Sequence, residues 1–273
     1  MHELLLYGQV SAGRHDQVLK ILAGVAAMQP LHILERCIIY KPQREPEEPG
    51  LNVRRGGTQN IAQKQGNKAA TAAAALYYTK LIQRLSEDDF GIEHGDPLSA
   101  DVKDGGEAKW LARWEDQPDT GDRGVSIRFT NTIELLSGDP HAHMVATGPN
   151  RYVTEYFVQG HRFVHGNVIV FLHRVLHEPG VRSLQQKPKT KLPDFAALQL
   201  LDMSGAYILE AKVRVQDFKD AATLESGVNE LKEFQKQMMG CVELSLPDRL
   251  SLDTRVKYRP PHAGTAVATN RPR

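Results

Sequence analysis

Histidine is the residue type whose spacing in this chain could most readily support chemistry. His161 and His165 lie in one strand-like segment and His173 and His177 in the next, so a hairpin would bring the four side chains into a ladder on one face. Two histidines four residues apart on a strand are about 13 Å apart, which is too far for both to bind one zinc ion. We therefore expect surface or hydrogen-bonding histidines. The alternatives are a pH-sensitive contact, or a metal site with ligands from both strands.

A second histidine pair, His141 and His143, lies in the sequence GDPHAH. Two imidazoles at this spacing resemble metal ligands, but no third ligand follows at a recognisable spacing, and Pro140 is typical of a loop. We expect both histidines to be solvated loop side chains rather than part of a metal site.

Glu210 and Lys212, in the strand-like segment LEAKV, would point to the same side of a sheet. The first interpretation is a solvated cross-strand ion pair. The alternative is a charged tunnel inside a barrel that binds metal and triphosphate. That chemistry needs Glu-x-Glu on the strands, so that several carboxylates meet at one ion. Only Glu45 and Glu47 have this spacing, and they lie in a proline-rich segment.

The sequence motifs of the common enzyme classes are absent. The chain has no P-loop, no GxGxxG turn, no GxSxG nucleophile elbow, no HExxH helix and no paired CxxC. We therefore expect no catalytic residue, no cofactor and no metal site. The alternative function is a tunnel-type phosphohydrolase or a barrel that binds a small ligand in its interior.

Composition narrows the class of protein further. A chain of 273 residues is long enough for one large domain or at most two, and the net charge of +1 gives no global field toward nucleic acid or a membrane. The two cysteines, Cys37 and Cys241, are too few for a disulfide framework and fit a reducing compartment. No apolar run approaches the roughly 18 residues that span a bilayer, so we expect a soluble intracellular protein.

Hydrophobic patterns predict a strand-rich chain with three helices. The expected helices follow Ser11 and end near Pro30, cover Asn67–Leu85, and cover Phe218–Met239. The expected strands are Glu3–Val10, Leu31–Tyr40, Lys109–Glu115, Val125–Leu135, Arg151–Val164, Asn167–His177, Tyr207–Val215 and Cys241–Leu246. Consecutive strands joined by hairpins indicate a mainly β (α+β) fold, in which an antiparallel sheet curls into a β-barrel with peripheral helices.

Segments rich in proline, glycine and charge interrupt these elements. We expect one barrel domain over residues 1–257, with disordered inserts near 42–66, 92–107 and 180–194 and a disordered tail over 258–273. The basic clusters Arg54-Arg55 and Lys187, Lys189, Lys191 fall in these inserts and are expected to be solvated linker charges.

Apolar residues on both faces of a strand indicate a protein-protein interface. Residues 168–172 are apolar at odd and even positions alike, and a barrel interior can hide only one of these two faces. The candidates for contact with a partner are Phe157, Phe163, Phe171, Val168 and Val170. The alternative is that some of them belong to the chain's own core.

Three segments resemble one known family. The start HELLLYGQV with the helix DQVLKILAGV, the hairpin YVTEYFVQGHRFVHGNVIVFLHRV and the closing YILEAKVRVQD with LPDRLSL are similar to subunit 18 of the Mediator of RNA polymerase II transcription, in its filamentous-fungal form. The resemblance covers about two thirds of the chain. Its most specific part is the run from Gly160 to Gly166 in the hairpin.

The resemblance implies a fold and a set of partners. The fold is a β-barrel related in shape to the tunnel triphosphatases but without their catalysis. The implied function is that of a non-catalytic coactivator subunit, a scaffold in the Mediator head module in the nucleus. The implied partners are Mediator subunit 20, a C-terminal helix of subunit 8 and other head subunits, with the RNA polymerase II machinery contacted indirectly. The residues themselves indicate no direct nucleic-acid site and no membrane contact.

Overall fold

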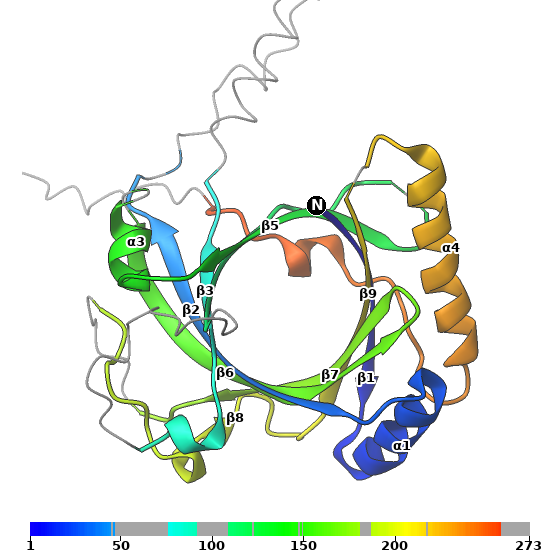
Figure 1. The fold of residues 1–273 in the computed structure, drawn as a ribbon, viewed down its shortest axis with the longest axis horizontal. Coiled ribbons are helices and arrows are strands. Elements are labelled where there is room, and N and C mark those ends of the chain that lie inside the picture. Colours follow the sequence, from blue (N-terminus) through cyan, green and yellow to red (C-terminus); the bar gives the residue numbers. More distant parts are fainter. Residues whose placement is uncertain are drawn as a thin grey trace, which may run out of the picture.

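The chain folds into an antiparallel β-barrel with helices on its outside (Figure 1). The computed structural model describes residues 1–44, 46, 76–91, 109–121, 123–146, 148, 150–180, 187–216 and 218–257. The strands are β1 (His2–Val10), β2 (Leu31–Pro42), β3 (Thr79–Arg84), β4 (Trp110–Glu115), β5 (Ser126–Leu135), β6 (Asn150–His165), β7 (Val168–His177), β8 (Gln199–Leu200) and β9 (Tyr207–Val215). The α-helices are α1 (His15–Ala26), α3 (Pro140–Ala146) and α4 (Ala221–Gln237), and short 3-10 turns occupy Ala12–Arg14, Glu87–Asp89, Phe195–Ala197 and Arg249–Leu252.

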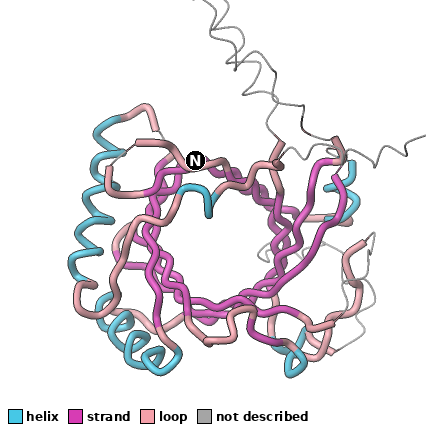
Figure 2. The backbone as a smooth tube through the Cα atoms, turned by 180° about the vertical axis from the view of Figure 1, so that it is seen from behind, coloured by secondary structure: helices cyan, strands magenta, loops and turns pink. Residues whose placement is uncertain are grey.

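Eight of the strands close into a ring. Their order is β6-β2-β3-β4-β5-β1-β9-β7, and the β6–β7 pairing closes it, while β8 pairs with the end of β7. Every strand pairing is antiparallel, and the ring is also plain when seen from behind (Figure 2). Closure satisfies the backbone hydrogen bonds that an open sheet would leave at its two edges. The predicted fold class is confirmed.

The apolar core lies outside the ring, beneath the helices. Along β9, Leu209, Ala211 and Val213 are buried in one cluster with residues of α4, which lies on the outer side of the barrel. Since successive side chains of a strand point to opposite faces, Glu210 and Lys212 face the lumen. The sequence YILEAKVRV therefore places its apolar half against a helix and its charged half inside the barrel.

Helix α4 packs closely on this outer face. It begins at the N-cap Asp220, whose carboxylate accepts a hydrogen bond from the Ala222 backbone N–H. A Cβ at Gly227 would lie 3.0 Å from Leu4 and 3.3 Å from Val213, so glycine lets the helix approach the sheet. Among the described residues, no helix has both the length and the apolar composition that crossing a bilayer requires.

Three expected elements were wrong. Thr79–Arg84, expected as part of a helix, is the strand β3, because pairing with β2 and β4 on both sides outweighs the helix propensity of this segment. Pro140–Ala146, expected as a loop, is the helix α3. Cys241–Leu246, expected as a strand, makes only an isolated bridge between Ser245 and Tyr7.

The predicted inserts fall mostly outside the described residues, as does the tail from residue 258 onward. Residues 187–194, expected to lie in a disordered insert, are described and pack on the barrel. Leu192 is buried beside Phe157, and the Lys189 carbonyl accepts a hydrogen bond of 2.7 Å from Arg36. This hydrogen bond is shielded from water, because the Arg36 side chain is completely buried.

Gly160 provides a test of the β6–β7 packing. It lies opposite His173, and a Cβ there would be 2.3 Å from the Leu172 carbonyl oxygen and 2.6 Å from the His173 Cα. Because these atoms are backbone, we expect Gly160→Ala to lower the free energy of unfolding by about 1–3 kcal/mol in a urea titration. Gly24→Ala is the matched control: it lies inside α1 with open space around it, and the same change there should stabilise by up to about 1 kcal/mol. Equal effects at the two sites would contradict the packing argument.

Candidate functional site

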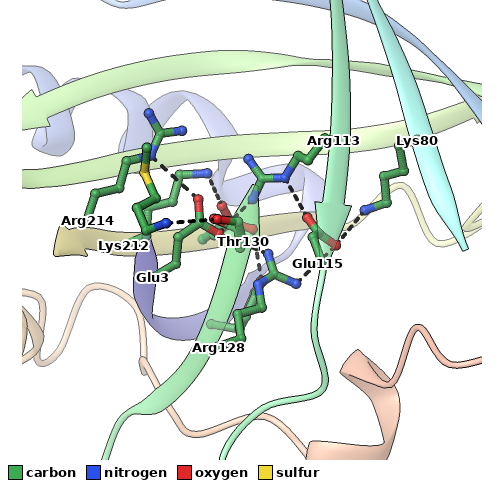
Figure 3. A network of polar contacts seen from close by, with 11 residues as sticks. Glu3, Lys80, Arg113, Glu115, Arg128, Thr130, Lys212 and Arg214 are labelled. Atoms are coloured by element: carbon green, nitrogen blue, oxygen red, sulfur yellow. Dashed lines mark hydrogen bonds and ion pairs between the residues drawn. The ribbon is translucent and has the colours of Figure 1, made fainter. Parts of the chain in front are cut away.

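A network of ion pairs lies in the barrel lumen (Figure 3). Its centre is Glu115 on β4, whose carboxylate contacts the Arg113 Nε at 2.7 Å, the Lys80 Nζ at 3.0 Å and the Arg128 Nη1 at 3.2 Å. Glu3 on β1 contacts the Arg113 Nη2 at 2.6 Å and the Arg128 Nη2 at 3.3 Å. The two arginines therefore bridge two carboxylates that come from different strands.

Strand register brings these side chains together. Glu3 lies directly opposite Arg128 in the β1–β5 pair, and Lys80 lies opposite Arg113 in the β3–β4 pair. Arg113 and Glu115 are two apart on one strand and so share a face. Four strands thus contribute to one contact set.

A second set occupies β9. The Lys212 Nζ donates to Glu210 Oε1 at 2.7 Å, and the Tyr7 hydroxyl donates to Glu210 Oε2 at 3.0 Å. An ion pair between Glu210 and Lys212 was predicted, but as a solvated one. The structure corrects the environment: both side chains lie in the lumen and are only 13% exposed.

The charges of the six most buried members of these two contact sets balance. Three carboxylates, of Glu3, Glu115 and Glu210, face three cations, of Arg113, Arg128 and Lys212, and none of these six side chains is more than 13% exposed. Two further cations are more exposed, Lys80 at 29% and Arg214 at 45%. A buried charge is tolerated only when it is paired, and these six charges pair with one another. Glu35 on β2 lies outside this set: burial raises the pKa of its carboxyl, and Lys212 and Arg84 act against that rise.

The acidity of the lumen groups follows from this pairing. Burial alone would raise the pKa of Glu115, but Lys80, Arg128 and Arg113 hold it well below its usual range. Burial would likewise raise the pKa of Glu210, and Lys212 holds it low. Burial and then the Glu210 charge raise the pKa of the Tyr7 hydroxyl, which stays a hydrogen-bond donor. The carboxylates of Glu115 and Glu210 are therefore ionised, and both already accept contacts from donors of the chain itself.

Such a lumen gives little support to metal-dependent chemistry. Within the described residues, no three His, Cys, Asp or Glu side chains are arranged to hold a metal ion. Glu115 and Glu210 use both of their oxygens on protein donors. A metal ion would have to displace cations that these carboxylates already bind.

The four histidines of the β6–β7 hairpin do not form the ladder that the hairpin could have allowed. The register pairs His161 with Leu172 and places Gly160 opposite His173, so His161 and His173 point to opposite faces of the barrel wall. His161 lies on the outer side, with ring centroids 5.7 Å from His15 and 5.5 Å from His32. Burial and then the neighbours His32 and His15 lower the pKa of His161.

The pair His141 and His143 also differs from expectation. Both lie on α3 rather than in a loop, and the His141 Nδ1 is 2.8 Å from the Tyr40 hydroxyl. Burial lowers the pKa of His141. The contact attaches α3 to β2, because Tyr40 is completely buried in the cluster that α3 covers.

The predicted partner residues lie mostly within the chain's own core. Phe157, Phe163, Val168 and Val170 are each at most 1% exposed, and Phe171 faces the lumen, where its ring stacks on His173 at 4.4 Å. The argument that a partner must cover the second face of β7 was therefore wrong, since α4 and α1 share a cluster with that face. Contact of these five residues with a partner stays a prediction.

The lumen residues Glu3, Arg113, Glu115 and Arg128 were missed in the sequence. The sequence did contain a pattern that could have indicated them, because the β4 segment WLARWE alternates charged with apolar or aromatic residues. Without the register, however, the sequence does not show that the charged face of each strand points inward.

Comparison with known proteins assigns the family. A family model described as Med18 protein matches residues 2–255, which is nearly the whole chain. The chain belongs to the Med18 protein family. The matched range begins at β1 and ends just before the last described residue, so it spans the entire barrel.

Individual Med18 relatives agree with this assignment. Subunit 18 of the Mediator of RNA polymerase II transcription from Neosartorya fischeri is 36% identical, over 94% of this chain and all of the relative. Its counterpart from Coccidioides immitis is 32% identical over the same shares. Among solved structures, a chain of the Schizosaccharomyces pombe Mediator head module matches with a TM-score of 0.61 at 18% identity, over 90% of this chain and 99% of that one. That likeness supports the barrel fold.

The central role of Glu115 can be measured. We expect Glu115→Gln to lower the free energy of unfolding by about 3–5 kcal/mol, because it leaves Lys80, Arg113 and Arg128 with too little negative charge in a buried site. Urea unfolding followed by circular dichroism gives the value. The control is Glu233→Gln, whose partner Lys236 lies on the surface of α4 and which should cost at most about 0.5 kcal/mol. A cost for Glu115→Gln as small as that of the control would contradict the network.

Proposed function

We propose that this protein is a non-catalytic subunit of the Mediator complex, acting as a protein-interaction scaffold of the head module in transcription by RNA polymerase II. The observation that carries the proposal is the 36% identity to Mediator subunit 18 of Neosartorya fischeri over its full length. The barrel supports it further, because a chain of the Schizosaccharomyces pombe Mediator head module has the same fold.

The finer parts of the proposal concern partners and location. The protein binds subunit 20 and a C-terminal helix of subunit 8, contacts other head subunits, and meets the polymerase machinery only indirectly. It acts in the nucleus, where RNA polymerase II transcribes. The family membership supports these points.

Assembly is tested by co-expression with subunit 20 and the C-terminal segment of subunit 8, followed by size-exclusion chromatography. We expect the three chains to elute together. Because Phe157 and Phe163 are core residues, Phe157→Asp and Phe163→Asp should lose both folding and co-elution, whereas Phe171→Asp tests a half-buried lumen position. Met203→Asp, at a side chain that is 85% exposed, is the control and should lose neither. Three folded chains that elute separately at micromolar concentration would refute the assembly.

The alternative function, a tunnel-type phosphohydrolase or small-ligand barrel, is not favoured, because the lumen carboxylates of Glu3, Glu115 and Glu210 are paired with cations of the chain itself. We expect phosphate release from nucleoside or RNA 5′-triphosphates to stay at background with Mg²⁺ or Mn²⁺. The matched variant is Glu210→Gln, which removes a lumen carboxylate. Metal-dependent turnover that Glu210→Gln abolishes while the protein stays folded would restore the enzymatic alternative.

A further inference from the structure

An acidic turn with an exposed serine follows the strand β3. Ser86 precedes the 3-10 turn Glu87–Asp89, so three acidic residues come directly after its hydroxyl. Ser86, Glu87 and Asp88 are exposed, and among the described residues neither Glu87 nor Asp88 forms an ion pair. The serine hydroxyl and two unpaired carboxylates are therefore open to water side by side.

This combination occurs once in the sequence. Ser86 is the only serine or threonine of the chain that has an acidic residue at each of the three following positions. Ser245 has an acid at the third position, Asp248, but Leu246 and Pro247 stand between them. Protein kinases choose substrates partly by the charges that flank the acceptor hydroxyl, and one class selects serines that acidic residues follow. Ser86 has the pattern of a substrate of that class.

The Ser86 hydroxyl also holds the turn closed. Asp89 Oδ2 accepts a hydrogen bond of 3.0 Å from the Ser86 hydroxyl and one of 2.7 Å from the Ser86 backbone N–H. The Asp89 backbone N–H in turn donates to the Ser86 carbonyl at 3.2 Å. Burial would raise the pKa of the Asp89 carboxyl, but the Ser86 donors and then Lys109 lower it. An ionised Asp89 thus ties both ends of the turn together.

The closed turn places Phe90 in an apolar cluster on the outer wall of the barrel. Phe90 is 8% exposed, and its ring centroid lies 5.6 Å from that of Phe157 and 5.2 Å from that of Phe195. Leu34 and Leu192 belong to the same cluster. Because Phe90 comes directly after Asp89, the position of its ring depends on the turn.

We propose that Ser86 is a phosphorylation site for a protein kinase of this acidic-directed class, and that its phosphate opens the turn and withdraws Phe90 from the cluster. The kinase transfers the γ-phosphoryl group of ATP. A bond forms between the Ser86 Oγ and phosphorus, the bond to the oxygen that bridges the β- and γ-phosphates breaks, ADP leaves, and the hydroxyl proton passes to a base of the kinase. The ester oxygen no longer donates to Asp89, and a group with a charge of about −1.5 to −2 lies beside that carboxylate.

The cations described near the turn do not reverse this effect. The Lys109 Nζ lies 3.2 Å from Asp89 Oδ1 and is 44% exposed, so one solvated ammonium group faces the phosphate together with the whole acidic turn. Arg84 lies opposite Glu35 on the lumen face of β3, where it acts on the Glu35 carboxyl. Negative charge therefore stays in excess around the phosphate, and Asp89 is repelled from Ser86.

Phosphorylation is measured on the full-length protein with casein kinase 2, an acidic-directed kinase, and radiolabelled ATP. We expect incorporation to fall at least about tenfold in Ser86→Ala. Glu87→Gln with Asp88→Asn should lower kcat/KM for phosphorylation at least about tenfold, because the pair removes recognition charges while the contacts of Asp89 stay in place. Ser245→Ala, at the other serine with an acid at the third position, is the matched control and should leave incorporation unchanged.

The opening of the turn has its own measurement. Hydrogen exchange followed by mass spectrometry should be at least about fivefold faster over Leu85–Phe90 in the phosphorylated protein, and treatment with a phosphatase should restore the original rate. The backbone N–H groups of Asp89 and Phe90 report on the turn directly, because both donate within it. Exchange in α1 is the internal control and should not change.

Three results would overturn the proposal. One is incorporation into the unaltered protein that is no greater than into Ser86→Ala. Another is full incorporation after Glu87→Gln with Asp88→Asn, because acidic residues would then not select the site. The third is exchange at the turn that is unchanged or slower after phosphorylation, because Lys109 would then close the turn around the phosphate. Circular dichroism confirms that each variant is folded, and the outcome does not depend on the Mediator assembly, because every measurement uses the isolated chain.

Discussion

The structure depends on placing ionised side chains inside a closed ring of strands. Closure of the β-barrel gives every strand one face toward the lumen, and β1, β3, β4, β5 and β9 all carry charge on that face. Ions removed from water are tolerated only when their partners are already in place. Arg113 and Arg128 meet that condition, because each is shared between Glu3 and Glu115.

This arrangement reverses the usual division of a small barrel, in which apolar side chains fill the interior. Since the lumen carries many charges, the largest apolar cluster lies outside it, where α4 and α1 lie over β9, β1 and β7. The helices are therefore part of the core rather than additions to it. A scaffold built this way has a rigid ring whose outer wall varies by sector, with helices on some strands and exposed aromatic rings on others.

The sequence predicted most strands because their patterns are local. The alternation in Tyr207–Val215 gave β9 with its observed bounds, and the hairpin around Gly166 gave β6 and β7. Prediction from the sequence failed where pairing with strands distant in the chain decides the secondary structure. Thr79–Arg84 carries an apolar spacing that suits a helix and became a strand through its two neighbours. The lumen network was equally hidden, because it joins strands that are far apart in the chain and register is a tertiary property.

The pairing of the first strand with the last has a consequence for synthesis. β1 forms its longest ladder with β9, about two hundred residues later, and the bridge from Tyr7 to Ser245 lies later still. At typical elongation rates of about 5–20 residues per second, β9 follows β1 only some ten to forty seconds later, whereas the other neighbour of β1, the strand β5, is made earlier. The barrel therefore cannot close before β9 has been synthesised, and until then β1 has only β5 beside it in the sheet.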